Sequence, residues 1–191
     1  MFHLDAGDIV QAAWVVFLVY WFAAALSLNR MKKREPAGEL LVRVVLLGIA
    51  FLLLDRSLQI WGVLNRRFIP YSNAVEEIGA ALTCLGIGFA IWARYHIGRY
   101  WSSTVSLRAD HQLIRTGPYA HIRHPIYTGI LLAVLGTGLA IGKYRVIVAF
   151  VIMLGGFTWK ARREEALLAS EFGAAFEEHK RLTGFFLPRF S

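Results

Sequence analysis

Cysteine is nearly absent from this chain of 191 residues, because Cys84 is the only one. A lone cysteine excludes an internal disulfide and a zinc site built from cysteine thiolates. Acidic residues are also few, since 13 Asp and Glu stand against 21 Lys and Arg and leave a formal net charge of +8. A basic balance of this size can indicate a nucleic-acid partner, but the basic residues gather between apolar runs, which indicates orientation in a membrane instead.

Extended polar segments are scarce as well. Hydrophobic residues make up 57% of the chain and aromatic residues 14%, which is not the composition of an ordinary soluble domain. About 20 consecutive apolar residues cross the hydrocarbon core of a bilayer. The apolar runs near that length are residues 9–28, 40–64, 74–97, 125–141 and 146–160. The sequence therefore predicts an all-α, polytopic integral membrane protein with about five transmembrane helices.

The last two runs are joined by residues 142–145, a connection so short that it predicts an antiparallel helical hairpin. Residues 161–182 follow and are predicted to form a cytoplasmic amphipathic helix. At 100° per residue, Glu165 falls on the same apolar stripe as Phe172 and Phe176. A carboxylate on a buried face needs a cationic partner, so Glu165 is expected to have one.

Charged residues inside an apolar run are rare, and Asp55 and Arg56 lie within the second run. Charge in a membrane helix is costly and is usually paired or directed to an interior. One interpretation places both residues near the outer end of the helix, where the arginine side chain extends to the interface. The other interpretation places them in a polar cavity, and the sequence leaves both open.

Basic residues are distributed unequally between the two sides of the predicted bundle. Residues 29–39, 94–123 and the tail from residue 160 hold four, five and six Lys and Arg, whereas residues 65–73 and 142–145 hold two each. The positive-inside rule then predicts a cytoplasmic polar loop and C-terminal helix, with the N-terminus outside. We expect a prokaryotic inner membrane as the location.

One polar stretch, residues 111–129, interrupts the apolar pattern. It contains three His, two Arg, two Tyr, two Pro and two Gly. Pro118 and Pro125 fix φ and disfavour helix in the residues before them. Pro125 is also well suited to the first turn of the next helix, where its missing N–H costs nothing. The stretch is therefore predicted to be a shaped polar loop that leads into an apolar helix.

This loop also carries a resemblance to a known family. The motifs are Gly117-Pro-Tyr119, Arg123-His-Pro-Ile-Tyr-Thr-Gly129, Glu164-Glu165 and a closing Phe172-Gly with His179-Lys-Arg and Leu187-Pro188. They resemble the isoprenylcysteine carboxyl methyltransferase (ICMT) family, which is related to the membrane phospholipid N-methyltransferases. The resemblance covers residues 95–188. It implies an integral membrane enzyme dependent on S-adenosylmethionine.

The resemblance also implies an organisation and a donor site. Residues 1–97 would be three N-terminal transmembrane helices, and residues 98–191 the catalytic, methyl-donor-binding region. The family's cofactor residues map onto His111, Leu113, Tyr119, His124, Pro125, Tyr127, Glu164 and Glu165. Histidine and backbone N–H groups would bind the carboxylate of S-adenosylmethionine, the glutamates its ammonium, and the tyrosine rings its sulfonium or adenine.

The catalytic residues are predicted to be Arg123, Glu165 and Arg181. A guanidinium can bind an acceptor carboxylate through two hydrogen bonds, which is the role expected for Arg123. Glu165 or Glu164 would orient it, and Arg181 would be a second cation. A carboxylate acceptor is ionised at neutral pH and needs no general base, because methyl transfer mainly requires alignment of the two substrates. The predicted reaction is carboxyl methylation of an isoprenylcysteine or a similar lipidic carboxylate from the bilayer.

Other interpretations of the same residues stay open. An amine acceptor would need a base, for which Glu164, Glu165 or His124 are candidates, and would make the protein a lipid N-methyltransferase. A non-catalytic membrane protein or a nicotinamide-dependent reductase could share the C-terminal fold. Considered individually, Arg123 could be one of the basic residues that flank a membrane helix on its cytoplasmic side, and Tyr119 and Tyr127 could be aromatic anchors at the membrane interface. We interpret His96, His121 and His179 as structural, and we expect no metal site and no nucleic-acid partner.

Overall fold

The computed structural model describes residues 5–26, 37–55, 57–59, 62–101 and 112–190. Its α-helices are α1 (Ala6–Leu26), α2 (Ala37–Leu54), α3 (Asn73–Ile97), α4 (Pro125–Ile141), α5 (Tyr144–Phe172) and α6 (Ala174–Leu182). Short 3-10 helices η1 (Val63–Asn65), η2 (Gly98–Tyr100) and η3 (Gly117–Ala120) lie in the connections. The described residues form no strand beyond two isolated bridges, so the all-α prediction is confirmed.

Three helices are long and apolar enough to cross a membrane: residues Ala6–Ala24 of α1, α3 as a whole and α5 as a whole. Two further apolar helices, Val44–Leu54 and Pro125–Ile141, are shorter than a full crossing. The protein is therefore a polytopic integral membrane protein, and the count of five spans stays a prediction.

Two helix boundaries differ from the prediction. The second apolar run was expected to continue to residue 64, but α2 ends at Leu54. The carboxylate of Asp55 accepts hydrogen bonds from the backbone N–H and hydroxyl of Ser57 instead, both at 2.8 Å, and such local bonds compete with helix formation.

In the C-terminal part, α5 continues through the predicted fifth span to Phe172, and Gly173 at φ 49° separates it from α6. Residues 161–182 are thus two helices joined by a glycine turn.

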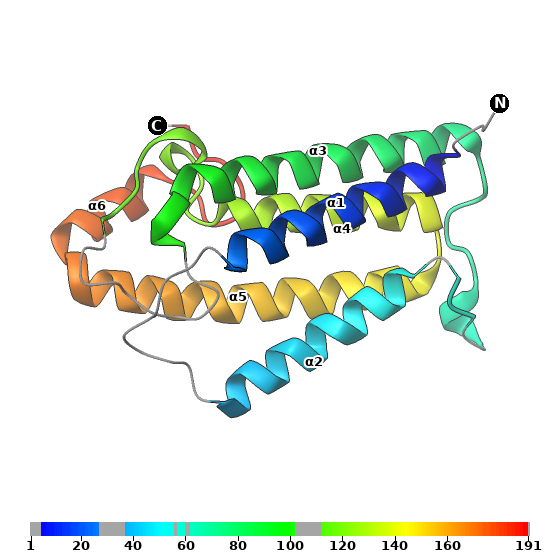
Figure 1. Cartoon of the computed structure of the whole chain (residues 1–191), viewed down its shortest axis with the longest axis horizontal. Coiled ribbons are helices and arrows are strands. Elements are labelled where there is room, and N and C mark those ends of the chain that lie inside the picture. Colours follow the sequence, from blue (N-terminus) through cyan, green and yellow to red (C-terminus); the bar gives the residue numbers. More distant parts are fainter. Residues whose placement is uncertain (1–4, 27–36, 56, 60–61, 102–111, 191) are drawn as a thin grey trace.

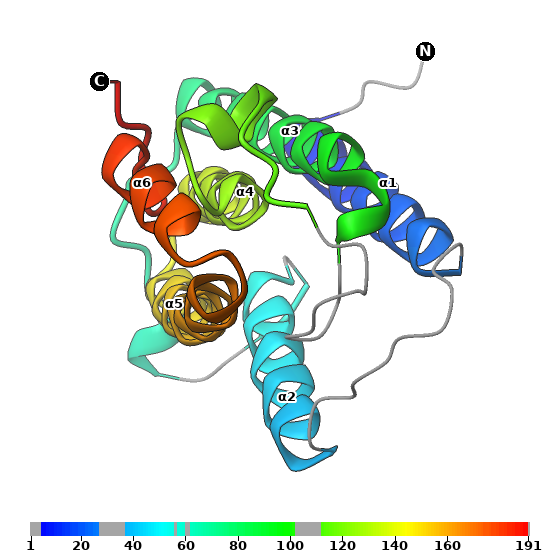
Figure 2. The same cartoon turned by 90° about the vertical axis from the view of Figure 1, so that its left-hand side faces the viewer.

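Helices α3 and α4 pack side by side through small residues (Figures 1 and 2). A Cβ added to Gly86 of α3 would lie 2.5 Å from the carbonyl oxygen of Gly129 in α4, and one added to Gly136 would lie 2.5 Å from the Thr83 nitrogen. Small residues let membrane helices approach this closely. Because α3 and α4 share one packed interface, the two predicted regions 1–97 and 98–191 are joined in a common core, and the division between them stays a prediction.

A buried hydroxyl pair adds a polar connection to this interface. The Thr83 and Thr137 hydroxyls lie 3.2 Å apart, and Thr137 accepts a 2.9 Å hydrogen bond from the Trp14 indole of α1. The indole and hydroxyl groups would be costly in an apolar interior without these partners. Three helices are therefore aligned by polar as well as close backbone contacts.

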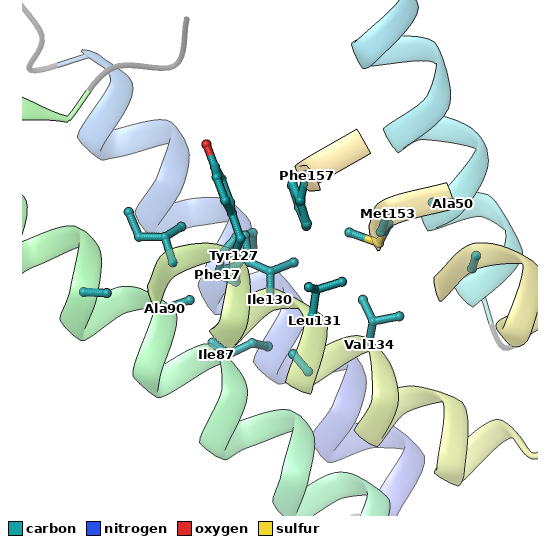
Figure 3. Packing of buried hydrophobic residues seen from close by; sticks show 14 of the residues in the cluster. Phe17, Ala50, Ile87, Ala90, Tyr127, Ile130, Leu131, Val134, Met153 and Phe157 are labelled. Atoms are coloured by element: carbon teal, nitrogen blue, oxygen red, sulfur yellow. The ribbon is translucent and has the colours of Figure 1, made fainter. Parts of the chain in front are cut away.

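The apolar core lies between α4 and its neighbours (Figure 3). Tyr127 and Val134 of α4 point towards Met153 and Phe157 of α5, while Phe17 of α1 packs on the same cluster. The rings of Tyr127 and Phe157 are stacked with centroids 4.8 Å apart. This stack holds the first turn of α4 against the middle of α5, which is where the polar residues of the motif begin.

Substitution of Gly86 by Val is expected to lower the free energy of unfolding by about 3 kcal/mol or more, because the added atoms meet backbone rather than flexible side chains. The matched control is Gly88→Val on the same helix, where a Cβ meets nothing within 4 Å. Thermal unfolding of both variants in detergent measures the effect. Equal melting temperatures for the two variants would contradict the close packing of α3 and α4.

Candidate active site

A cavity of about 130 Å³ is lined by residues of α3, α4, α5 and α6. Figures 1 and 2 show that α6 and the C-terminus lie at the same end of the bundle. The walls of the cavity come from the end of α3 and residue 101, the loop 112–124 with the first turn of α4, and the end of α5 with α6. The lining side chains are Ile97, Tyr100, Trp101, Gln112, Leu113, Ile114, Tyr119, Arg123, His124, Ile126, Tyr127, Glu164, Leu167, Leu168, Phe176 and His179. The site is therefore assembled from the predicted motif loop and two distant helices.

The loop is shaped by a glycine turn against α3. Gly117 has φ 57°, and a Cβ there would lie 2.6 Å from the His96 ring. His96 is hydrogen-bonded to the Thr116 hydroxyl at 2.9 Å, which supports the structural role predicted for it. Tyr119, two residues after Gly117, is buried. Its hydroxyl donates a 3.4 Å hydrogen bond to the Ala93 carbonyl oxygen. Burial raises the pKa of Tyr119, so its phenol stays protonated.

The C-terminal segment is paired with the motif. The backbone N–H of Arg123 donates to the Gly184 carbonyl at 2.9 Å, and the N–H of Gly184 donates to the His121 carbonyl at 3.0 Å. The Thr128 hydroxyl donates to the Phe186 carbonyl at 2.7 Å. A Cβ on Gly184 would overlap the carbonyl oxygen of Leu187, so this segment needs glycine there. The tail thereby closes one side of the motif loop.

The guanidinium of Arg123 is the centre of a charged cluster. Its Nε lies 2.6 Å from a carboxylate oxygen of Glu165, and its Nη1 donates to the backbone carbonyls of Lys180, at 3.1 Å, and of Thr183. The same Glu165 oxygen is 3.2 Å from Nε2 of His124. Within the described part of the chain, Nη2 of Arg123 has no hydrogen-bond partner. The Nη2 atom of this arginine is therefore available to a ligand in the cavity.

Glu164 forms the second half of the cluster and lines the cavity. Its two oxygens accept from the Tyr127 hydroxyl at 2.9 and 3.1 Å, and Lys160, one turn earlier, lies 3.5 Å away. The Tyr127 ring stacks on His124, with centroids 5.6 Å apart. Both glutamates face the N-terminal end of α4, where the helix dipole also favours negative charge.

The predicted residues fall into three groups. Leu113, Tyr119, Arg123, His124, Tyr127 and Glu164 line the cavity. Glu165 lies directly behind it, since it contacts Arg123 and His124 without lining the cavity, and Pro125 is the buried first residue of α4. Arg181 is exposed on α6 and is not part of the lining. His111 lies outside the described residues.

Sequence reasoning missed a buried histidine of the cavity. His179 was interpreted as structural, but it is buried and lines the cavity beside Phe176. Desolvation by burial, followed by the charges of Arg115 and Arg123, lowers the pKa of His179, so the ring is neutral at pH 7. Phe176 was expected on the buried stripe with Glu165, and His179 is three residues further on. That spacing was the signal that could have identified it.

The arrangement suits a ligand with separated charges and a flat apolar part. Glu164 offers negative charge, Nη2 of Arg123 offers a donor, and Leu168 and Phe176 form apolar wall. Neither glutamate is a free base, because Glu165 is paired with a guanidinium and Glu164 accepts from a phenol. The site is thus built for binding and alignment more than for proton removal.

The chain has curated relatives with similar sequence. It is 33% identical to the protein-S-isoprenylcysteine O-methyltransferase of Schizosaccharomyces pombe over 101 residues, 51% of this chain and 43% of that protein. It is 34% identical to the cobalt-zinc-cadmium resistance protein CzcN of Cupriavidus metallidurans over 120 residues, 61% of this chain and 52% of that protein. The chain thus spans about half the length of each of these relatives.

A solved structure and a family profile agree with these relatives. The eukaryotic intramembrane Ras methyltransferase ICMT has a similar fold, with a TM-score of 0.51 and 20% identity over 83% of this chain and 56% of that one. Residues 79–170 match the profile of the isoprenylcysteine carboxyl methyltransferase (ICMT) family. This segment runs from the α3 interface through the motif loop and both glutamates of α5. Through it, almost half of the chain matches the ICMT family.

Proposed function

We propose that this protein is a membrane methyltransferase that transfers a methyl group from S-adenosylmethionine to the carboxylate of a lipidic acceptor such as an isoprenylcysteine. The observation that supports the proposal most directly is the cluster of Arg123, His124, Tyr127, Glu164 and Glu165 at one cavity. These residues come from the segment that matches the family. The match to a methyltransferase family implies a methyl donor, and the identity of that donor is part of the proposal.

The residues present fit S-adenosylmethionine. Its ammonium can pair with Glu164, and its carboxylate can accept from Nη2 of Arg123 and from loop backbone N–H groups. The apolar wall with Leu113, Leu168 and Phe176 suits an adenine ring. When bound, S-adenosylmethionine supplies an electrophilic methyl group. The protein residues then hold the two substrates in line and exclude water, an effect of roughly 7–11 kcal/mol on the barrier in favourable cases.

The acceptor is proposed to be a carboxylate because both acidic side chains of the site, Glu164 and Glu165, already accept hydrogen bonds from other side chains. An amine acceptor must lose a proton before or during methyl transfer. Glu165 is paired with Arg123, and Glu164 accepts from the Tyr127 hydroxyl and lies 3.5 Å from the Lys160 ammonium. A carboxylate acceptor needs no proton removed. The site is proposed to face the cytoplasm of a prokaryotic cell, in agreement with the distribution of basic residues.

The test has a binding step and a transfer step. Purified protein in detergent is titrated with S-adenosylhomocysteine by calorimetry, and saturable 1:1 binding is expected. It is then incubated with methyl-labelled S-adenosylmethionine and either N-acetyl-S-farnesylcysteine or its carboxamide. Label is expected in the free acid alone, in an alkali-labile form that releases methanol, because esters hydrolyse and N-methyl amines do not.

Each negative result has its own meaning. Folded protein that does not bind S-adenosylhomocysteine would contradict the donor assignment. Alkali-stable label in an aminophospholipid, with none in the prenylated acid, would overturn the carboxylate acceptor in favour of N-methylation.

A further inference from the structure

A second arginine, far from the candidate active site, is buried with two of its three side-chain nitrogens unpartnered among the described residues. Arg145 of α5 has 0% of its surface exposed. Its Nη1 donates to the backbone carbonyls of Leu53 and Asp55 at the end of α2, both at 2.6 Å. Its Nε and Nη2 are fully buried and have no partner in the part of the chain that the structure describes. Unpaired buried donors on a charged group are costly, so a ligand acceptor is expected there.

The free atoms form one edge of the guanidinium. Nε and Nη2 point their N–H groups in the same direction, whereas Nη1 is the nitrogen already bonded to α2. Two parallel N–H groups on one edge match the spacing of two oxygens of a phosphate or carboxylate. The unused part of Arg145 is therefore the part that binds oxyanions.

Arg145 lines a second cavity, of about 680 Å³. This cavity is formed by the start of α1, the end of α2, the turn between α4 and α5, and the beginning of α3. These elements meet at the end of the bundle opposite α6 (Figure 1). A water molecule takes up about 30 Å³ in the liquid. The cavity is thus far larger than a single ion needs and has room for a multi-atom polar group.

The charged lining of this cavity is balanced rather than purely basic. The cations are Arg67, Lys143 and Arg145, and the carboxylates are Asp8, Asp55 and Glu76. Nε of Arg67 donates to the Ile69 carbonyl, and the Lys143 ammonium donates to the Asn65 side chain. Asp8 accepts from the backbone of Asp5. A bare anion would give this balanced lining an excess of negative charge, so the balance favours a ligand that carries both signs.

Two carboxylates retain acceptor capacity for a cation. Asp55 uses Oδ1 for Ser57, and Glu76 uses Oε2 for the Tyr71 hydroxyl. Their other oxygens, Oδ2 and Oε1, have no hydrogen-bond donor among the described residues. The hydrogen bonds from Ser57 also lower the pKa of Asp55, so the group stays ionised at neutral pH. The cavity therefore offers a free guanidinium edge on one side and free carboxylate oxygens on another.

We propose that this cavity binds a phosphoethanolamine group, with its phosphate on the Nε and Nη2 edge of Arg145 and its ammonium beside Asp55 and Glu76. The cavity lies at the ends of helices α1 and α3, both long enough to span a membrane. Lipid headgroups occupy that level of a bilayer. An aminophospholipid can thus deliver the group with its chains in the membrane, and a water-soluble phosphoethanolamine compound is the other source of the same chemistry.

Native mass spectrometry of delipidated protein tests the proposal. Phosphatidylethanolamine and phosphatidylglycerol with identical chains are added separately, together with a soluble competitor, glycerophosphoethanolamine. We expect one tightly held phosphatidylethanolamine, bound about tenfold more strongly than phosphatidylglycerol. The Arg145→Met variant is expected to weaken it by about tenfold or more, because charge-assisted hydrogen bonds are lost. The matched control is Arg66→Met, an exposed arginine at the same end that does not line the cavity.

A second variant keeps the test decisive if Arg145→Met does not fold. Asp55 is exposed, so Asp55→Asn is expected to fold and to reduce the preference for phosphatidylethanolamine over phosphatidylglycerol. Competition by glycerophosphoethanolamine at equal affinity would assign a soluble source, and its absence a lipid source. Equal binding of the two lipids by wild-type protein, or unchanged binding in both variants, would overturn the proposal. Affinity for S-adenosylhomocysteine is expected to stay unchanged in both variants, because this site is separate from the candidate active site.

Discussion

Substitution of Glu164 by Gln is expected to weaken S-adenosylhomocysteine binding by about 10- to 100-fold. Glu164 is the carboxylate that lines the cavity, and an ionic hydrogen bond to a ligand contributes about 1.5–3 kcal/mol. Glutamine keeps the size of the side chain and can still accept from the Tyr127 hydroxyl, so the shape of the site is preserved. Calorimetric titration of the purified variant gives the change in affinity directly.

The matched control for this prediction is Glu171→Gln. Glu171 lies on the same helix two turns further on and is exposed, so its replacement is expected to leave the affinity unchanged. Wild-type affinity in the Glu164→Gln variant would remove this residue from the donor site. A similar loss in both variants would point to a general effect of charge rather than to a contact.

Substitution of Arg123 by Met is expected to abolish methyl transfer and to destabilise the protein by about 3–5 kcal/mol. The carboxylate of Glu165 is nearly buried, and in the variant it loses its cation. Removal of one partner of a buried ion pair is strongly destabilising, because the other charge stays buried without compensation. It also removes the bonds from Nη1 to the carbonyls of Lys180 and Thr183, which hold the C-terminal segment. Thermal unfolding and turnover of a prenylated acid are measured on the same preparation.

A double variant separates the two roles of Arg123. Arg123→Met with Glu165→Gln removes both charges, so part of the stability is expected to return while turnover stays absent. Recovery of turnover in the double variant would limit Arg123 to holding Glu165 and the tail. Arg181→Met is the control, and because Arg181 is exposed, little change is expected in either measurement. A complete loss of turnover in that control would instead support the catalytic role first predicted for Arg181.

Some features of the site follow from short-range patterns. The proline and glycine positions predicted a polar loop leading into a helix, and α4 begins at Pro125 as expected. The helical period put Glu165 on a buried stripe, and its carboxylate is mostly buried and paired with Arg123. Both inferences depend only on residues within a few helical turns of one another, so the local sequence is sufficient to predict the helix start and the buried face.

Other features needed the fold. The motif did not reveal which glutamate faces the cavity, because the rotation of α5 about its axis is set by its packing on α2 and α4. Glu164 lines the cavity and Glu165 lies behind it. The pairing of residue 184 with the motif loop joins segments about sixty residues apart, and no local pattern encodes it.

By itself, the sequence determined a helical membrane protein with a charged polar loop, because run length and period are properties of the chain in one dimension, and the motifs in that loop resemble those of the ICMT family. Only the tertiary structure decided which charges neutralise one another. It joined Arg123 to Glu165 and left two donors of Arg145 unpaired at the opposite end. The physical reason is that ion pairing and burial depend on distances between helices. Packing fixes those distances, here through contacts as close as those between Gly86 and Gly129.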